Sequence, residues 1–207
     1  MEELINTLQN QGIEDKSVLE AMRKVDRKDF VPPSFKHRAY MDIPISIGSG
    51  QTISQPTVVG LMTQELQLKP THRVLEVGTG SGYQTMVLSH LARHVYTTER
   101  IRSLHQKAKN LILKKYRREN ISFIYSDGAL GLPEAAEFDR IIVTAASEEI
   151  PRKLMEQLKV GGIMVLPVVE SEWQQRLVVV NKTEPEVEYK EVCAVRFVPL
   201  IEGIEDA

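Results

Sequence analysis

The stretch with the clearest chemistry is the glycine-rich run EVGTGSG, which occupies residues 76–82 after an apolar, strand-like segment. In open α/β sheets, ligands bind at such a turn between the first strand and the helix that follows it. Gly78, Gly80 and Gly82 let the backbone approach a ligand closely. Tyr83, however, stands where a dinucleotide fingerprint has its third glycine. The spacing therefore predicts a ligand-binding turn and disfavours a pyrophosphate.

Glu76 narrows the chemistry of that ligand. A carboxylate two residues before the first glycine would repel a pyrophosphate, whereas it suits a ligand that carries an ammonium and a sulfonium. S-adenosylmethionine carries both groups. No lysine follows the glycines as it does in a P-loop, which disfavours a nucleoside triphosphate. The residues of this run that we expect to bind S-adenosylmethionine are Glu76, Gly78, Thr79, Gly80, Ser81 and Gly82.

Two further acids end the next predicted strands. Glu99 lies close to the offset of about 20 residues past the glycines at which an acidic side chain binds ribose hydroxyls. Asp127 and Gly128 end the third strand, where a carboxylate can accept a hydrogen bond from an adenine amino group. An acid at a strand end can equally be a helix N-cap or a turn former, and this alternative stays open for both. Three acids at three strand ends favour a nucleoside ligand.

From Arg73 onward, short apolar runs alternate with helical segments, which predicts parallel strands joined by helices. The last two strands have only a polar turn between them, so we expect an antiparallel hairpin at the sheet edge. The predicted fold is α/β: an open, doubly wound, mostly parallel Rossmann-like sheet with N-terminal helices and an antiparallel C-terminal edge hairpin. The predicted strands are 73–78, 94–99, 121–126, 139–145, 163–168, 176–181 and 192–198.

The segment before the first strand has a different composition. Its apolar spacing predicts two short helices, the second of which starts at a capping box formed by Ser17 and Glu20. Proline and glycine residues make 34–51 a predicted loop. The loop leads into a helix for which Ser54 is a candidate N-cap, with Pro56 in the first turn.

Length and composition fit one globular domain. The chain has 207 residues, of which 42% are hydrophobic and 26% charged. Within a single domain, we expect residues 1–56 to form the N-terminal helices and the substrate loop. Residues 57–168 would form the cofactor-binding core, and residues 169–207 the C-terminal strands.

Charge and cysteine content limit the partners and the compartment. The formal net charge is −2, which gives little attraction to nucleic acid. Cys193 is the only cysteine, so no disulfide forms within the chain, as suits a reducing cytoplasm. We find no secretory signal and no apolar run of membrane-spanning length, and His90 and His94 lack a third metal ligand nearby. We therefore expect a cytoplasmic monomer without a nucleic-acid partner, a membrane partner or a metal.

Four segments carry a resemblance to one known family: GSGQTISQP at 48–56, RVLEVGTGSGYQT at 73–85, FDRIIVTAA at 138–146 and VRFVPL at 195–200. From about Val18 to Leu200, the chain resembles the protein-L-isoaspartate O-methyltransferases of bacterial type. Other methyltransferases share the glycine turn. The combination of TISQP before it and VRFVPL after it is similar to this family specifically.

The resemblance implies methyl transfer from S-adenosylmethionine to the free α-carboxylate of an L-isoaspartyl residue in a damaged protein or peptide. The ester then cyclises to a succinimide, which hydrolyses partly to aspartate and so initiates repair. Ser54 would be the catalytic residue that orients the carboxylate, and Ile53, Ala145, Val195 and Arg196 would line the peptide groove. A carboxylate with an ordinary pKa of about 4 needs no general base, so the task is alignment. Ser54 can also be an N-cap, because a hydroxyl both donates and accepts.

Some positions depart from the family pattern and leave the shape of the substrate groove open. Thr57 and Gly60 stand where bacterial relatives usually carry a tyrosine and an alanine, and 126–133 replaces a glycine-led, aromatic-bearing version. One alternative is a methyltransferase of the same fold that acts on RNA or a small carboxylate, which would leave TISQP and VRFVPL without a role. Another is a binding module without activity, which the presence of Ser54, Glu76 and Glu99 disfavours.

Overall fold

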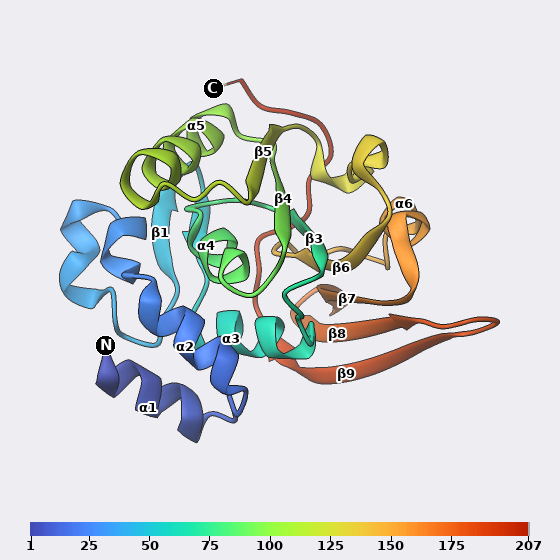
Figure 1. The fold of residues 1–207 in the computed structure, drawn as a ribbon, viewed down its shortest axis with the longest axis horizontal. Helices are drawn as coiled ribbons and strands as arrows, with labels where there is room; N and C mark the ends of the chain where they lie inside the picture. Colours follow the sequence, from blue (N-terminus) through green and yellow to red (C-terminus); the bar gives the residue numbers. More distant parts are fainter. Residues whose placement is uncertain (207) are drawn as a thin grey trace.

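The computed structural model describes residues 1–206 and contains a seven-stranded sheet between two layers of helices (Figure 1). Across the sheet the order is β5-β4-β3-β6-β7-β8-β9. The strands from β5 to β7 are parallel, and β8 and β9 are antiparallel to their neighbours. Their bounds are β3 Arg73–Val77, β4 His94–Glu99, β5 Ile121–Tyr125, β6 Phe138–Val143, β7 Leu158–Ser171, β8 Gln174–Lys182 and β9 Val187–Val195.

Six α-helices accompany the sheet: α1 Glu2–Asn10, α2 Lys16–Lys24, α3 Pro56–Glu65, α4 Tyr83–Ser89, α5 Arg102–Leu111 and α6 Arg152–Gln157. Short 3-10 helices occupy Arg27–Phe30, Pro33–Arg38, Gly128–Leu130 and Pro133–Ala135, and a π-helical turn occupies Ile112–Tyr116. Alternate residues of each buried strand face opposite layers. Val74 of β3 packs into the core that contains α1 to α5, whereas Leu75 packs into the core that contains α6. Burial on both faces explains why the central strands are continuous apolar runs.

The predicted fold class is confirmed, including the antiparallel hairpin at the C-terminal edge. One predicted loop is wrong in part, because residues 45–53 form a hairpin of β1 (Ile45–Gly48) and β2 (Gln51–Ile53). Ile45 and Ile47 are buried while the residues between them are exposed, which is the alternation typical of a strand. Gly48, Ser49 and Gly50 all have positive φ and make the tight turn.

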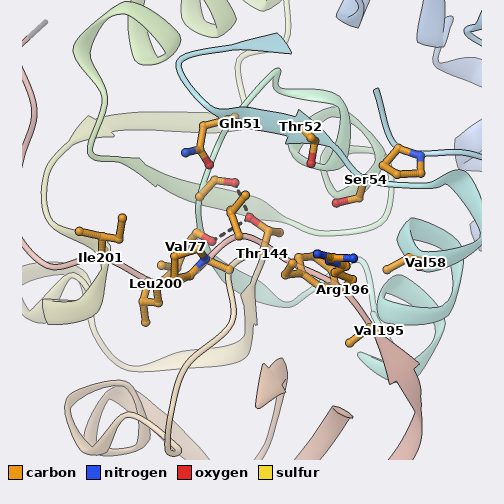
Figure 2. A pocket seen from close by; sticks show the side chains of 18 of the residues that line it. Gln51, Thr52, Ser54, Val58, Val77, Thr144, Val195, Arg196, Leu200 and Ile201 are labelled. Carbon is orange, nitrogen blue, oxygen red and sulfur yellow. Dashed lines mark hydrogen bonds between the residues drawn. The ribbon is translucent and has the colours of Figure 1, made fainter. Parts of the chain in front are cut away.

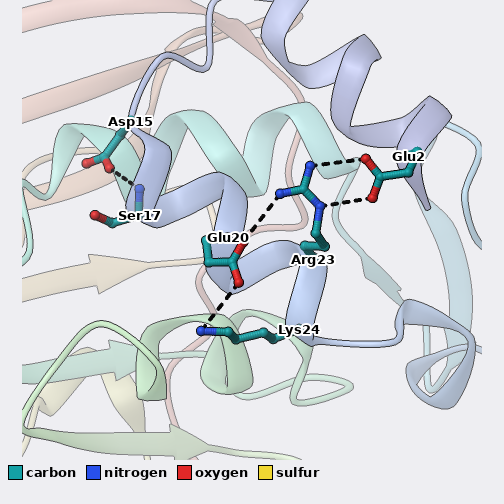
Figure 3. A network of polar contacts seen from close by, with 6 residues as sticks. All are labelled: Glu2, Asp15, Ser17, Glu20, Arg23 and Lys24. Carbon is teal, nitrogen blue, oxygen red and sulfur yellow. Dashed lines mark hydrogen bonds and ion pairs between the residues drawn. The ribbon is translucent and has the colours of Figure 1, made fainter.

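The predicted capping box of the second helix is wrong. Asp15 is the N-cap of α2, and its Oδ1 accepts hydrogen bonds from the backbone N–H groups of Ser17 (2.8 Å) and Val18 (3.3 Å), as Figure 3 shows for Ser17. Glu20 forms ion pairs with Arg23 and Lys24 instead of reaching back to a helix end. The helix thus begins one residue before Ser17, because the aspartate two positions earlier is already an acceptor in capping position.

The two histidines singled out above have separate partners. His94 Nε2 lies 2.9 Å from Ser122 Oγ, and His90 Nδ1 lies 3.1 Å from the guanidinium of Arg118. Within residues 1–206 there is no cluster of three or more potential metal-binding side chains. Over the same residues, no helix has the length and apolar character needed to cross a membrane.

Candidate functional site

A cavity of about 400 Å³ lies at the carboxyl ends of β3, β4 and β6, where the strand order reverses (Figure 2). Ligands bind at this point in doubly wound sheets. Three parts of the chain form its walls: the strand ends, the β1–β2 hairpin with the segment after it, and the C-terminal segment that crosses from β9 toward α5 (Figure 1). The residues that matter below are Gln51, Thr52, Ser54, Gly78, Gly80, Thr98, Glu99, Ile101, Gly128, Thr144, Ala145, Val195, Arg196, Leu200 and Ile201.

The glycine turn after β3 is held from both neighbouring strands. On the β4 side, the N–H groups of Gly78 and Thr79 donate to Thr98 O (2.9 and 3.0 Å). On the β6 side, Thr144 Oγ1 donates to Val77 O (3.0 Å) and Gly78 O (2.8 Å). Gly78 has φ +99°, and a Cβ there would lie 2.3 Å from Thr144 Oγ1. Only glycine therefore permits this close contact between the turn and the end of β6.

Glu76 lies beneath the glycine turn and does not line the cavity. Its side chain is fully buried, and Oε2 accepts hydrogen bonds from Thr85 Oγ1 (2.5 Å) and Thr97 Oγ1 (2.6 Å). Oε1 has no hydrogen-bond partner. Burial raises the pKa of Glu76 to about 8, against the opposing effect of the two hydroxyls. At neutral pH this carboxyl is therefore mainly protonated, and it supports the turn from within the sheet.

The carboxylates of the other two predicted acids also accept hydrogen bonds from backbone N–H groups. Glu99 lines the cavity but is only 6% exposed, and its two oxygens accept from Gly80 N–H (2.8 Å) and Ile101 N–H (2.9 Å). Burial raises the pKa of Glu99, although these backbone donors oppose the rise. Asp127 lies outside the cavity wall and accepts from Ala129 N–H (2.9 Å) and Gly203 N–H (2.7 Å). Each carboxylate oxygen of Glu99 keeps a second lone pair that a ligand hydroxyl can use.

The opposite wall presents polar groups without partners. Ser54 lines the cavity, and its hydroxyl makes no hydrogen bond within residues 1–206. The N-cap alternative for Ser54 is wrong: Gln55 is the N-cap of α3, and its side chain makes no cap hydrogen bond. Arg196 lines the cavity with a guanidinium that forms no ion pair or hydrogen bond in the described part of the chain. Figure 2 shows both side chains directed into the cavity from separate segments.

The structure brings eight of the predicted site residues to the cavity wall: Ser54, Gly78, Gly80, Glu99, Gly128, Ala145, Val195 and Arg196. The other predicted residues lie behind the wall or beside it: Ile53, Glu76, Thr79, Ser81, Gly82 and Asp127. Ile53 is 3% exposed, and Thr79 pairs its hydroxyl with that of Thr97 (2.6 Å). Roles for all of these residues in binding remain predictions.

Sequence reasoning missed several wall residues. Thr144 follows the strand next to β3, and this position at the switch point was a signal that could have identified it. Gln51 was the last residue of the predicted loop, and Thr52 begins the TISQP motif but was given no role. Leu200 ends the VRFVPL motif but was given no role, and Ile201 lies outside it; both reach the cavity wall, where Leu200 N–H donates to Ala146 O (2.7 Å).

Comparison with solved structures identifies the class of protein to which this fold belongs. A crystal structure from Plasmodium falciparum, described as a protein-L-isoaspartate O-methyltransferase in complex with S-adenosyl-L-homocysteine, matches with a TM-score of 0.85. The match has 27% identity and covers 96% of this chain and 97% of that one. The chain is thus a Rossmann-like α/β protein of the methyltransferase class.

Sequence comparison defines the family within that class. The sequence model of the protein-L-isoaspartate(D-aspartate) O-methyltransferase family matches residues 1–205. A protein-L-isoaspartate O-methyltransferase from Roseobacter denitrificans is 54% identical over 202 residues, which are 98% of this chain and 94% of that protein. One from Jannaschia sp. is 53% identical over 95% of this chain and 88% of its own length. The chain belongs to the protein-L-isoaspartate O-methyltransferase family, as its sequence motifs predicted.

Proposed function

We propose that this protein methylates the free α-carboxylate of L-isoaspartyl residues in damaged proteins and peptides and so initiates their repair through a succinimide. The observation that carries the proposal is one cavity with two unlike walls. The glycine turn and Glu99 form one wall, and the unpaired groups of Ser54 and Arg196 face it from the other. When bound, S-adenosylmethionine supplies a sulfonium methyl group, whose C–S bond breaks as the carboxylate oxygen bonds to its carbon.

The residues at the strand ends fit this cofactor. Gly80 lines the cavity, and only Ile47 Cδ1, at 3.7 Å, comes within 4 Å of the place where its Cβ would be. Backbone and ligand can therefore meet there without a side chain between them. Glu99 would accept from the ribose hydroxyls through its free lone pairs. Ile101 and Gly128 add apolar and backbone surface on the same side, as expected around an adenine ring.

The opposite wall suits a carboxylate that reacts without a base. None of the cavity-lining residues in the described part of the chain is a histidine, cysteine or lysine. Since an isoaspartyl carboxylate is already ionised at neutral pH, Ser54 needs only to donate a hydrogen bond that fixes its orientation. Arg196 would attract the same negative charge and lose that attraction once the carboxylate is a neutral ester. This loss of attraction would favour release of the methylated product.

The neighbouring backbone suits a peptide better than RNA. Val195 ends β9, which is the edge strand of the sheet, and an edge strand can pair with an extended peptide by strand addition. A formal net charge of −2 gives no general attraction to phosphates. We propose on these grounds that the protein acts on proteins and not on nucleic acid. We also propose, from the composition described above, a single-domain monomer of the reducing cytoplasm without a membrane partner. Ile53 and Ala145 would complete the peptide groove.

The direct test uses the purified protein with methyl-labelled S-adenosylmethionine and two peptides that differ only in an isoaspartyl or aspartyl linkage. We expect base-labile label, released as volatile methanol, from the isoaspartyl peptide alone. Total RNA and a free dicarboxylic acid serve as competing acceptors in parallel reactions. Equal labelling of both peptides, or label in RNA instead of peptide, would contradict the proposal.

A further inference from the structure

Asp42 makes an unusually complete set of contacts for a residue outside the cavity wall. Its Oδ1 accepts from the backbone N–H of Thr57 (2.8 Å). Its Oδ2 accepts from Thr57 Oγ1 (2.7 Å) and from Gln55 Nε2 (2.9 Å). Three donors from one short segment therefore converge on a single carboxylate. This carboxylate does for α3 what the side chain of its own N-cap does not.

These contacts close the base of the β1–β2 hairpin. Asp42 precedes the hairpin and Gln55 and Thr57 follow it, while the ladder itself ends at the pair Ile45 and Ile53. Ser54 lies directly between the last ladder residue and the residues that Asp42 holds. Its backbone is thus fixed on one side by the ladder and on the other side by Asp42.

The other side of Asp42 is anchored as well. The guanidinium of Arg27 is fully buried and donates through Nη2 to the carbonyl oxygen of Ile43 (3.3 Å). Burial lowers the pKa of Arg27 to about 10, and the electrostatic influence of Tyr83 and Asp42 opposes that change. The residue next to Asp42 is therefore held against the interior, so the carboxylate has a fixed support from which to hold Thr57.

We infer that Asp42 is a positioning residue that sets the place of the Ser54 hydroxyl at the methyl-acceptor wall of the cavity; this inference rests on the function proposed above. Thr57, which departs from the usual family residue, supplies two of the three donors to Asp42 and does not line the cavity. Only the hydrogen bond from Thr57 Oγ1 depends on the identity of this residue, so the departure adds one of the three donors to Asp42. Because orientation of a nucleophile contributes strongly to rate, a small shift of Ser54 costs turnover even when the cavity keeps its shape.

The experiment compares Asp42→Ala with Asp15→Ala. Asp15 is a matched control, since it is another aspartate that caps a helix (Figure 3), and it does not line the cavity. We expect Asp42→Ala to lower kcat/KM for isoaspartyl peptide about 10- to 100-fold, with affinity for S-adenosyl-L-homocysteine changed less than about twofold. Asp15→Ala should lower the melting temperature and leave both quantities unchanged. Asp42→Asn, which keeps an acceptor for Thr57 N–H, should restore part of the activity.

A double-mutant cycle shows whether Asp42 acts through Ser54. In a Ser54→Ala background, Asp42→Ala should have less than about a third of its effect on turnover, because the group that it positions is gone. Equal effects in both backgrounds, or a lowered melting temperature with unchanged kinetics, would overturn the inference and leave Asp42 a helix cap.

Hydrogen exchange separates this inference from the proposed function. In Asp42→Ala, amide protection should fall in residues 51–58 and not in the rest of the protein, with Thr57 most affected. If the wild type does not methylate isoaspartyl peptide, the proposed function fails, and the exchange result decides whether Asp42 holds this segment. Unchanged protection there would reject the positioning role.

Discussion

The two walls of the cavity differ in whether their polar groups are hydrogen-bonded within the protein. On the cofactor wall, Glu99 accepts backbone hydrogen bonds through both carboxylate oxygens, and Thr144 holds the glycine turn with its only hydroxyl. On the acceptor wall, the hydroxyl of Ser54 and the guanidinium of Arg196 have no partner within residues 1–206. The polar groups of the first wall are already hydrogen-bonded within the protein, whereas those of the second wall are free to bind a ligand.

Burial explains the difference. A polar group inside the sheet costs roughly 1–3 kcal/mol when it is unpaired, so most such groups have partners, with Oε1 of Glu76 as an exception. Groups at the acceptor wall are in contact with solvent and carry no such cost. We infer that the cofactor wall is a rigid cradle for one invariant molecule and that recognition of varied protein substrates relies on the unpaired side chains. The variants below are in order of decreasing effect, and all except Glu76→Gln alter one wall of the cavity.

Gly78→Ala should damage the cofactor wall most. The new Cβ would lie 2.3 Å from Thr144 Oγ1 at φ +99°, so the hydrogen bonds that hold the turn must break. We expect affinity for S-adenosyl-L-homocysteine, measured by calorimetry, to fall about 1000-fold, from strain and lost hydrogen bonds together. Gly12→Ala is the control, because Gly12 has φ +90° with nothing within 4 Å of its Cβ position. Normal ligand affinity of Gly78→Ala would show that the cradle is not rigid.

Ser54→Ala should affect the acceptor wall alone. We expect turnover on isoaspartyl peptide to fall about 10- to 1000-fold, as on loss of one donor to a charged group, with cofactor affinity near normal. The melting temperature should stay close to that of the wild type, because the hydroxyl makes no hydrogen bond within residues 1–206. A lowered melting temperature with normal turnover would withdraw the catalytic assignment.

Glu99→Ala should weaken cofactor affinity by about 10- to 100-fold, on the order of 1.5–3 kcal/mol for charge-assisted bonds. Because Glu99 also accepts from Gly80 and Ile101, the melting temperature should fall as well. Glu99→Gln keeps one acceptor and should retain an intermediate affinity. Calorimetry that shows unchanged affinity in both variants would reject the ribose assignment.

Glu76→Gln should change the pH dependence of stability. Burial raises the folded pKa of Glu76 from 4.5 to about 8, so its contribution to stability is full below pH 4.5 and is lost as pH rises through 8. Glutamine cannot ionise. We therefore expect the free energy of unfolding of the variant to fall by about 2 kcal/mol less than that of the wild type between pH 6 and pH 8. Parallel stability curves would mean that Glu76 is ionised in the folded protein.

Arg196→Ala should have the smallest effect, because the guanidinium is solvent-exposed. We expect KM for isoaspartyl peptide to rise about fivefold, with kcat and cofactor affinity nearly unchanged. Raised salt should diminish the difference between variant and wild type. Arg152→Ala is the matched control, since that side chain is 92% exposed on α6 and pairs only with Glu156. Equal KM values for both variants would remove Arg196 from substrate recognition.

The sequence by itself determined the order of strands and helices from Arg73 onward, the glycine turn and the family. These features depend on local periodicity, on the conformational freedom of glycine and on contiguous motifs such as TISQP and VRFVPL, all of which are visible along the chain. The sequence also predicted that Glu99 lies beside the glycine turn, because parallel strand ends meet at one sheet edge. Ser54 was assigned to the same site only through the resemblance to the family, and both residues line the cavity.

Only the tertiary structure decided which hydrogen-bond donors and acceptors pair with one another. The spacing of residues did not reveal that Asp42, and not Ser54, caps α3, or that Asp127 holds Gly203 in the C-terminal segment. Nor did it reveal that Glu76 is buried beneath the turn. A hydrogen bond forms with whichever donor the fold brings within about 3 Å, and residues far apart in sequence compete for that place. For this reason the acids could be recognised from their types and positions, whereas their partners required the folded chain.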